Sequence, residues 1–329
     1  MNKLDIAQKL FDGGFIDENS FEKIKKRSTG SPFSLNIELK VLLFSGIMLL
    51  TAGLGILIYQ YIDSIGHLAV ILLIASVSFI CFAYCYKNRL PYSNEKVKPP
   101  SVFFEYIVLL ACLTFISFNG YLQYQYSIYG SANGASFLVP AILFFATAYF
   151  FDQPGVLSLA ITCFAAFLGI TIAPTLLLAA NDFSNHTIIF TGLLLGALLV
   201  LAGRLLWQRQ IKIHFTFTYY NFALHILFIS SLAALFTFEQ SFIFLPLLAA
   251  LVITCIRYAK DEKSFYFLLT AVIYGYIGLS YFILNLMLNL SNFDVGIIYL
   301  SLIYLIGSSV FIIKYLKGSR KKIKQYADL

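Results

Sequence analysis

Polar side chains at regular helical spacing interrupt the long apolar runs of this chain, and they are the residues best placed to do chemistry. In one run Asn119 and Gln123 stand four residues apart, so a helix brings them to one face. In a later run Thr218, Asn221 and His225 share a face as well. Because hydrocarbon does not solvate polar groups, these side chains need water or protein partners. The pattern predicts either a polar path for a solute, ion or proton or hydrogen bonds between helices.

Two further polar residues complete the candidate set. Glu105 comes early in the run that holds Asn119, at the expected inner membrane surface, and Asn285 lies near the outer end of a late run. No apolar run contains a central Asp, Lys or Arg, the usual coupling group of a proton- or ion-driven carrier. The candidate intramembrane residues are Glu105, Asn119, Gln123, Thr218, Asn221, His225 and Asn285.

Motifs for nucleotide, metal or covalent chemistry are absent from the sequence. It holds no phosphate-binding loop, dinucleotide fingerprint, HExxH pair, serine elbow or CxxC pair. All five cysteines lie in apolar runs and imply no disulfide framework. Cys81 and Cys85 share a helix face, which fits small packing residues better than a metal pair. We therefore expect no catalytic residue, no metal and no cofactor, and a protein that is not an enzyme.

The elements that hold the polar residues are apolar runs long enough to cross a bilayer. The 329 residues are 60% hydrophobic and 12% charged, whereas soluble domains carry about 25% charged residues. Since a span takes roughly 20 residues, the sequence predicts an all-α, polytopic helical membrane protein with ten transmembrane helices. The expected spans are 40–62, 65–86, 102–124, 135–151, 155–180, 187–206, 215–237, 241–257, 264–288 and 294–316.

The distribution of basic residues supports this division into ten spans. With the N-terminus inside, all 23 Lys and Arg residues fall in inside connections or termini, and the outer loops hold none. Because basic residues collect on the cytoplasmic side, we expect both termini in the cytoplasm. The net charge of +7 then reflects topology rather than a nucleic-acid partner. The weakest division is the tight turn at Asp152–Gly155, the one inside connection without Lys or Arg.

Glycines at helical spacing mark a close contact between helices. Gly192 and Gly196 form a small-xxx-small pair in the sixth expected span, and Gly203 lies further along a similar face. Small residues let two helix backbones approach each other in a membrane. The pattern predicts close packing of this helix against a neighbour.

Three regions are expected along the chain. Residues 1–38 form a cytoplasmic amphipathic segment, interpreted as a short helical hairpin in which Asn19 and Glu22 form a capping box. Residues 39–317 form the transmembrane helix bundle, and residues 318–329 form a basic cytoplasmic tail. The expected partner is the lipid bilayer. Residues 1–38 are either a surface for a protein partner or a passive segment beside the membrane, and the oligomeric state stays open.

A family resemblance rests on longer stretches of sequence. The segment GGFIDENSFEKI, followed by the glycine-rich LLFSGIMLLTAGLGILIYQYIDSIGH, resembles the bacterial membrane proteins grouped as domain of unknown function 2157. The stretches FEYIVLLACLTFISFNGYLQYQY and YFFDQPGVLSLAITCFAAFLGI are similar to longer members from Bacteroidetes-type bacteria. The domain would cover roughly residues 5–150. Many members carry an Asn-Trp pair after the first helix, whereas this chain reads Tyr59–Asp63 there.

The resemblance implies a protein of the bacterial inner membrane with unassigned activity, and it supplies no catalytic residues. Together with the missing motifs, it favours a non-enzymatic multi-pass inner-membrane protein, such as a scaffold or envelope component. The alternative is a secondary transporter or channel for a small solute or a lipid-like substrate.

Overall fold

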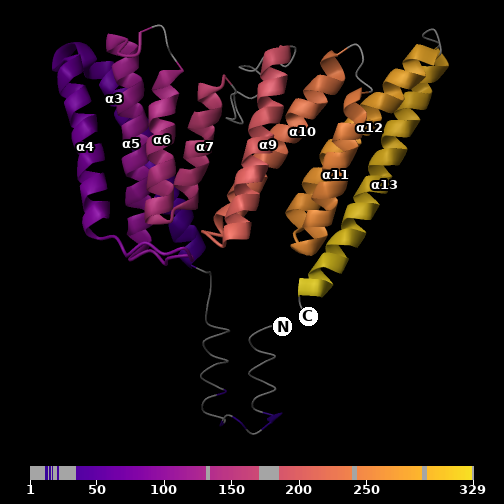
Figure 1. Ribbon diagram of the computed structural model, residues 1–329, viewed down its shortest axis with the longest axis horizontal. Coiled ribbons are helices and arrows are strands. Elements are labelled where there is room, and N and C mark those ends of the chain that lie inside the picture. Colours follow the sequence, from indigo (N-terminus) through magenta and orange to yellow (C-terminus); the bar gives the residue numbers. More distant parts are fainter. Residues whose placement is uncertain are drawn as a thin grey trace. The chain divides into compact units, whose positions relative to one another are not determined.

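The computed structural model describes residues 12–13, 15, 17, 21, 35–130, 134–169, 185–238, 243–290 and 295–327. The expected hairpin within 1–38 lies almost entirely outside these residues. The described helices, coloured along the sequence in Figure 1, are α3 (Leu35–Ile65), α4 (His67–Lys87), α5 (Val102–Tyr126), α6 (Ala135–Phe151), α7 (Pro154–Phe167), α9 (His186–Arg209), α10 (Phe215–Thr237), α11 (Phe244–Asp261), α12 (Phe265–Leu290) and α13 (Val295–Ala327).

The chain is helical throughout its described elements and forms two compact units. Most of α3 belongs to the unit Met1–Gln60, and α4 to α13 belong to the unit Tyr61–Ala327. Within the second unit, consecutive helices pack mainly as neighbouring pairs, α4 with α5, α6 with α7, α9 with α10, and α11 with α12. The connections 152–153, 210–214 and 262–264 are short and favour antiparallel neighbours, whereas the longer connection 88–101 joins α4 and α5.

The ten helices in the described residues follow the order of the ten expected spans. The fifth is shorter than expected, because α7 ends at Phe167 whereas the expected span ran to residue 180, and residues 170–184 lie outside the described residues. Six of these helices are long and apolar enough to cross a membrane, namely α4, α5, α9, α10, α12 and α13. Shorter apolar helices are Val41–Gly53 within α3, α6 and α7. In α11, the charged residues Arg257, Lys260 and Asp261 occupy the last turns and shorten the apolar part. The protein is therefore a polytopic helical membrane protein.

Large apolar side chains cover the outer faces of several helices. Phe79 on α4 is 74% exposed, and Ile303 and Phe311 on α13 are each 70% exposed. Within the apolar stretch of α13, Gly296–Arg320, none of the residues is buried. Water would make such surfaces costly, at about 25 cal/mol per Å² of apolar area, whereas lipid tails solvate them. The outer faces thus fit a bilayer.

Residues with left-handed backbone end two helices, α6 and α9, and also occur in the connection that follows α9. Asp152 ends α6 with φ 60°, and Gln210 ends α9 with φ 55°. Lys212 follows with φ 46°. Pro154 begins α7, where its missing N–H costs nothing because the first amides of a helix have no helical acceptor. The tight turn expected between the fourth and fifth spans is confirmed.

The expected close packing of the sixth span is also confirmed. A Cβ added at Gly196 would lie 2.5 Å from Leu227 Cγ and 3.3 Å from the Ala223 carbonyl on α10. At Gly192 an added Cβ would overlap the Ser230 hydroxyl. The glycine face of α9 therefore sets how closely α9 and α10 approach.

Candidate functional site

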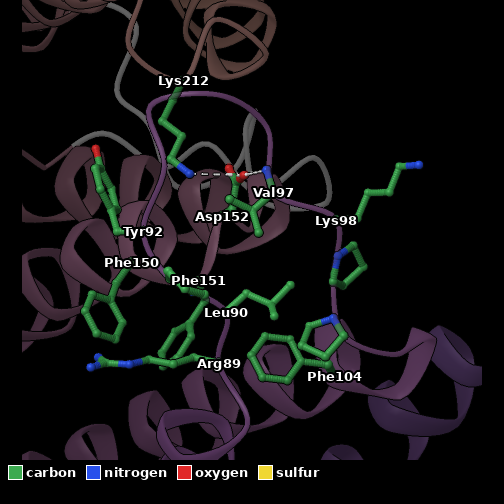
Figure 2. Close-up of a pocket in the computed structure, with 13 residues that line it drawn as sticks. Arg89, Leu90, Tyr92, Val97, Lys98, Phe104, Phe150, Phe151, Asp152 and Lys212 are labelled. Carbon is green, nitrogen blue, oxygen red and sulfur yellow. Dashed lines mark hydrogen bonds and ion pairs between the residues drawn. The ribbon is translucent and has the colours of Figure 1, made fainter.

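A buried acidic residue joins three connections at one end of the second unit. The Asp152 side chain is 4% exposed and lies in the turn between α6 and α7. Its Oδ2 accepts a hydrogen bond from the Val97 amide at 2.5 Å and lies 3.1 Å from Lys212 Nζ. Its Oδ1 lies 2.6 Å from His214 Nε2. Figure 2 shows Asp152 between Lys212 and Val97.

Lys212 is held on several sides. Its side chain is only 1% exposed, its amide donates to the Asn94 carbonyl at 2.7 Å, and its Nζ donates to the Glu95 carbonyl at 3.4 Å. The ammonium also lies 5.0 Å from the centre of the Tyr92 ring. A buried charge needs such partners, because desolvation costs several kcal/mol (roughly) per ion. The connection between α4 and α5 is thereby fixed to the turn before α10.

His214 completes the cluster from the connection before α10. Burial lowers the pKa of its imidazole below the usual value, with smaller contributions from Lys212 and Lys96, although Asp152 acts in the opposite direction. A hydrogen bond from His214 Nε2 to Asp152 Oδ1 places a ring proton on Nε2. His214 and Lys212 thus contact the two different oxygens of the Asp152 carboxyl group.

The space beside this cluster is small. The hollow drawn in Figure 2 has a volume of about 20 Å³ and is lined by Tyr92, Phe104, Phe151, Asp152, Lys212 and neighbouring residues. About 10–15 Å³ is the least that a single water needs. Arg89 closes the nearby surface with its guanidinium 4.1 Å from the Tyr86 ring and 4.3 Å from the Phe150 ring. The cluster is thus a structural junction with no room for a substrate.

The expected polar face of α10 is bonded to α12. His225 Nδ1 lies 3.0 Å from the Tyr274 hydroxyl, and His225 Nε2 lies 2.7 Å from the Tyr266 hydroxyl. The Tyr266 hydroxyl also donates to Asn221 Oδ1 at 2.5 Å. Thr218 is buried on the same helix, 8% exposed. The structure thus brings Asn221 and His225 together through one tyrosine that sequence reasoning had not selected.

The expected polar face of α5 is bonded to the loop that follows it. Asn119, 4% exposed, donates to the Ser136 carbonyl at 2.6 Å. Its Oδ1 accepts from the Tyr129 hydroxyl at 2.7 Å. Gln123 accepts from the Tyr129 amide at 2.9 Å and donates to the Gly130 carbonyl at 3.3 Å. These side chains therefore close the connection between α5 and α6.

The two remaining candidates lie apart from these groups. Glu105 is in the first turn of α5, where a negative charge suits the positive end of the helix dipole. Its backbone carbonyl accepts from Gln153 Nε2 at 3.3 Å. Asn285 is half-buried in α12. Asn119 and Gln123 form hydrogen bonds with the segment from Tyr129 to Ser136. Asn221 and His225 form hydrogen bonds with tyrosines of α12. The two pairs therefore contact different parts of the chain.

Sequence reasoning placed Asp152 in a tight turn and counted Lys212 among the basic residues of the connections, and it did not select His214. One signal pointed to Asp152: it is the one acidic residue in the single inside connection that lacks Lys and Arg. A carboxylate in such a turn can bind cations from neighbouring connections on the same side. Among the residues that the structure describes, no group of three or more His, Cys, Asp or Glu is placed to hold a metal ion.

Long apolar helices, apolar outer faces and internally bonded polar groups define a multi-pass helical membrane protein. Its residues 8–157 match the family described as "Predicted membrane protein (DUF2157)", and this part of the chain belongs to that family. The match confirms the resemblance stated from the sequence and lies close to the expected range of 5–150. Comparison with curated proteins and with solved structures gives no significant match.

Proposed function

We propose that this chain is a non-enzymatic structural component of the bacterial cytoplasmic membrane, with ten spans and both termini in the cytoplasm. The observation that carries the proposal is that Asn119, Gln123, Asn221 and His225 each form a hydrogen bond with another group of the protein. A carrier needs polar groups in its spans that are free to exchange protein partners for a solute or ion. Here those groups fasten helices and loops to one another.

The Asp152 cluster supports the proposed topology. It joins the connections 88–101, 152–153 and 210–214, all three of which the charge pattern assigns to the cytoplasmic side. An error of one span before Lys212 would put two of these connections on opposite sides of the membrane. The contacts and the positive-inside rule therefore favour the same alternation.

Reporter fusions test the topology. A reporter active only in the periplasm should work when fused after residues near 130, 184, 240 and 291, and a cytoplasmic reporter should work after residues near 92, 210 and 261. Periplasmic activity after 92, 210 or 261 would contradict the ten-span arrangement. Fusion after Asp152 is the most informative test of the topology, because that turn contains no Lys or Arg to indicate which side of the membrane it faces.

The structural role is tested by comparing a deletion strain with strains that carry single variants. We expect envelope defects in the deletion strain, such as sensitivity to detergent or osmotic shock, without accumulation of one metabolite. Tyr266→Phe, which removes the hydroxyl that joins Asn221 to His225, should complement the deletion in proportion to its abundance in the membrane. A specific metabolite change, restored by the wild type and not by an equally abundant Tyr266→Phe protein, would favour the transporter or channel instead.

A further inference from the structure

A second and much larger hollow lies near the Asp152 cluster. It has a volume of about 620 Å³ and opens among the ends of α9, α10, α11 and α12. Sites for small molecules span about 300–1,000 Å³. His214 lines this hollow and also contacts Asp152, so both features lie at the same end of the second unit. The lining residues are Trp207, Ile213, His214, Thr216, Phe217, Tyr220, Tyr258, Asp261, Glu262, Ser264 and Phe267.

Aromatic rings form a continuous wall of the hollow. The ring centres of Tyr220 and Tyr258 are 5.1 Å apart at an angle of 81°, and those of Tyr258 and Phe267 are 5.1 Å apart at 71°. Phe217 continues the series, 5.5 Å from Phe267 at 62°. Trp207 adds a fifth ring. Neighbouring rings packed edge to face keep part of their electron-rich faces open, and such faces attract cations.

The charges of the lining have one sign. Asp261 and Glu262 are exposed at the end of α11 and face the hollow as part of its lining. The lining contains no Lys or Arg, although Lys260 and Lys263 flank the two carboxylates in sequence and, like Arg204 and Arg257, are exposed outside it. The balance of the lining is therefore negative, although the chain as a whole carries +7. That contrast favours a cationic ligand.

Thr216 provides an independent sign of a missing partner. It lines the hollow, is 6% exposed, and its hydroxyl has no hydrogen-bond partner among the described residues. Other threonines of the helices, such as Thr254 and Thr270, donate to a carbonyl four residues earlier. A buried polar group without a partner calls for a water or a ligand to complete it.

We propose that this hollow binds an organic ammonium ion at the cytoplasmic end of the protein. The carboxylates of Asp261 and Glu262 neutralise the charge, and the ring faces contact the carbon atoms attached to nitrogen. Trp207 and Tyr258 lie in the last turns of α9 and α11, and Trp and Tyr are enriched where membrane helices meet lipid headgroups. The ammonium can thus come from an ethanolamine headgroup of a phospholipid or from a soluble amine. Binding of this kind adds a ligand to the proposed structural component and requires no transport.

Trp207 makes the test specific, because it is the single tryptophan of the chain and lines the hollow. The full-length protein in nanodiscs of phosphatidylglycerol is titrated with choline and with ethanolamine while tryptophan emission is recorded. We expect a saturable change with at least one of them, and none with 3,3-dimethylbutanol, the neutral isostere of choline. Lack of saturation with both amines, or an equal response to the neutral compound, would overturn the proposal.

Lipid composition then distinguishes the two sources. If an ethanolamine headgroup is the ligand, nanodiscs containing phosphatidylethanolamine should show the shifted emission before titration and weaken the soluble probes by competition. If a soluble amine is the ligand, the same nanodiscs should leave both the starting emission and the titration unchanged. Either result supports an ammonium site and assigns its source.

Charge-neutral variants test the assigned residues. Asp261→Asn combined with Glu262→Gln should raise the apparent Kd about tenfold or more. Phe217→Leu, at a ring that is 52% exposed, should raise it several-fold while both carboxylates remain. Glu95→Gln is the matched control, an exposed carboxylate outside the hollow, and should leave the Kd within about twofold. Unchanged affinity in the double variant, or in Phe217→Leu if the double variant does not fold, would refute the proposal.

Discussion

Replacing Asp152 by Asn tests whether the buried ion pair holds the three connections together. Asn keeps the size of the side chain and removes its charge, so Lys212 loses its counter-ion while remaining 1% exposed. At the observed separation of 3.1 Å and an effective dielectric constant of about 20, the attraction is about 5 kcal/mol. Leaving one member of a buried pair unpaired typically costs about 3–5 kcal/mol. We expect the free energy of unfolding to fall by this amount.

Steric trapping in bicelles measures this free energy with the protein still in a bilayer. The double variant Asp152→Asn/Lys212→Met carries neither charge and should regain most of the loss, to within about 1–2 kcal/mol of the wild type, because no buried charge remains. Lys98→Met, an exposed lysine of the same connection, is the matched control and should change stability by less than about 0.5 kcal/mol. A coupling energy below about 0.5 kcal/mol between Asp152 and Lys212 would refute the reasoning.

Three further predictions concern other contacts. Gly196→Ala should destabilise the protein by about 1–3 kcal/mol through overlap with Leu227, whereas Gly120→Ala, where an added Cβ meets nothing within 4 Å, should be neutral or stabilising; equal melting shifts would contradict this. Because His214 has a lowered pKa, its contribution is present above its unfolded pKa of about 6.5 and is lost as pH falls below that value, so His214→Gln should flatten the acid limb of a stability profile. Tyr266→Phe should cost about 0.6–2 kcal/mol because Asn221 Oδ1 and His225 Nε2 lose the hydroxyl that both contact, while His225 Nδ1 keeps Tyr274, against no measurable change for Tyr124→Phe, a tyrosine that is 83% exposed.

The packing of α9 against α10 shows what the local sequence can predict and what it cannot. The spacing of Gly192, Gly196 and Gly203 predicted a close helix contact, because only small residues allow it. The spacing does not identify the partner helix, because any neighbouring helix could pack against the glycine face. The structure identifies α10 and the contacting residues Ser230, Leu227 and Tyr220.

The polar residues within spans illustrate a different limit. Spacing placed Asn221 and His225 on one helix face, but their common partner Tyr266 lies 45 and 41 residues further along the chain. Tyrosines are frequent in this chain, 22 in all, so composition could not single this one out. Only the packing of α12 against α10 selects it.

The sequence by itself indicated the order of the helices in the described residues, since each depends on the length of an apolar run and on the residues that end it. It also indicated the alternation of connections, because all 23 basic residues fall on one side of a ten-span division. Tertiary structure alone decided that the turn at Asp152, the one expected inside connection without a basic residue, receives the Lys212 charge from another connection. It also decided that Trp207, Tyr258 and Asp261 enclose a single hollow. These contacts depend on how distant helices pack, and helical period and hydropathy carry no information about that packing.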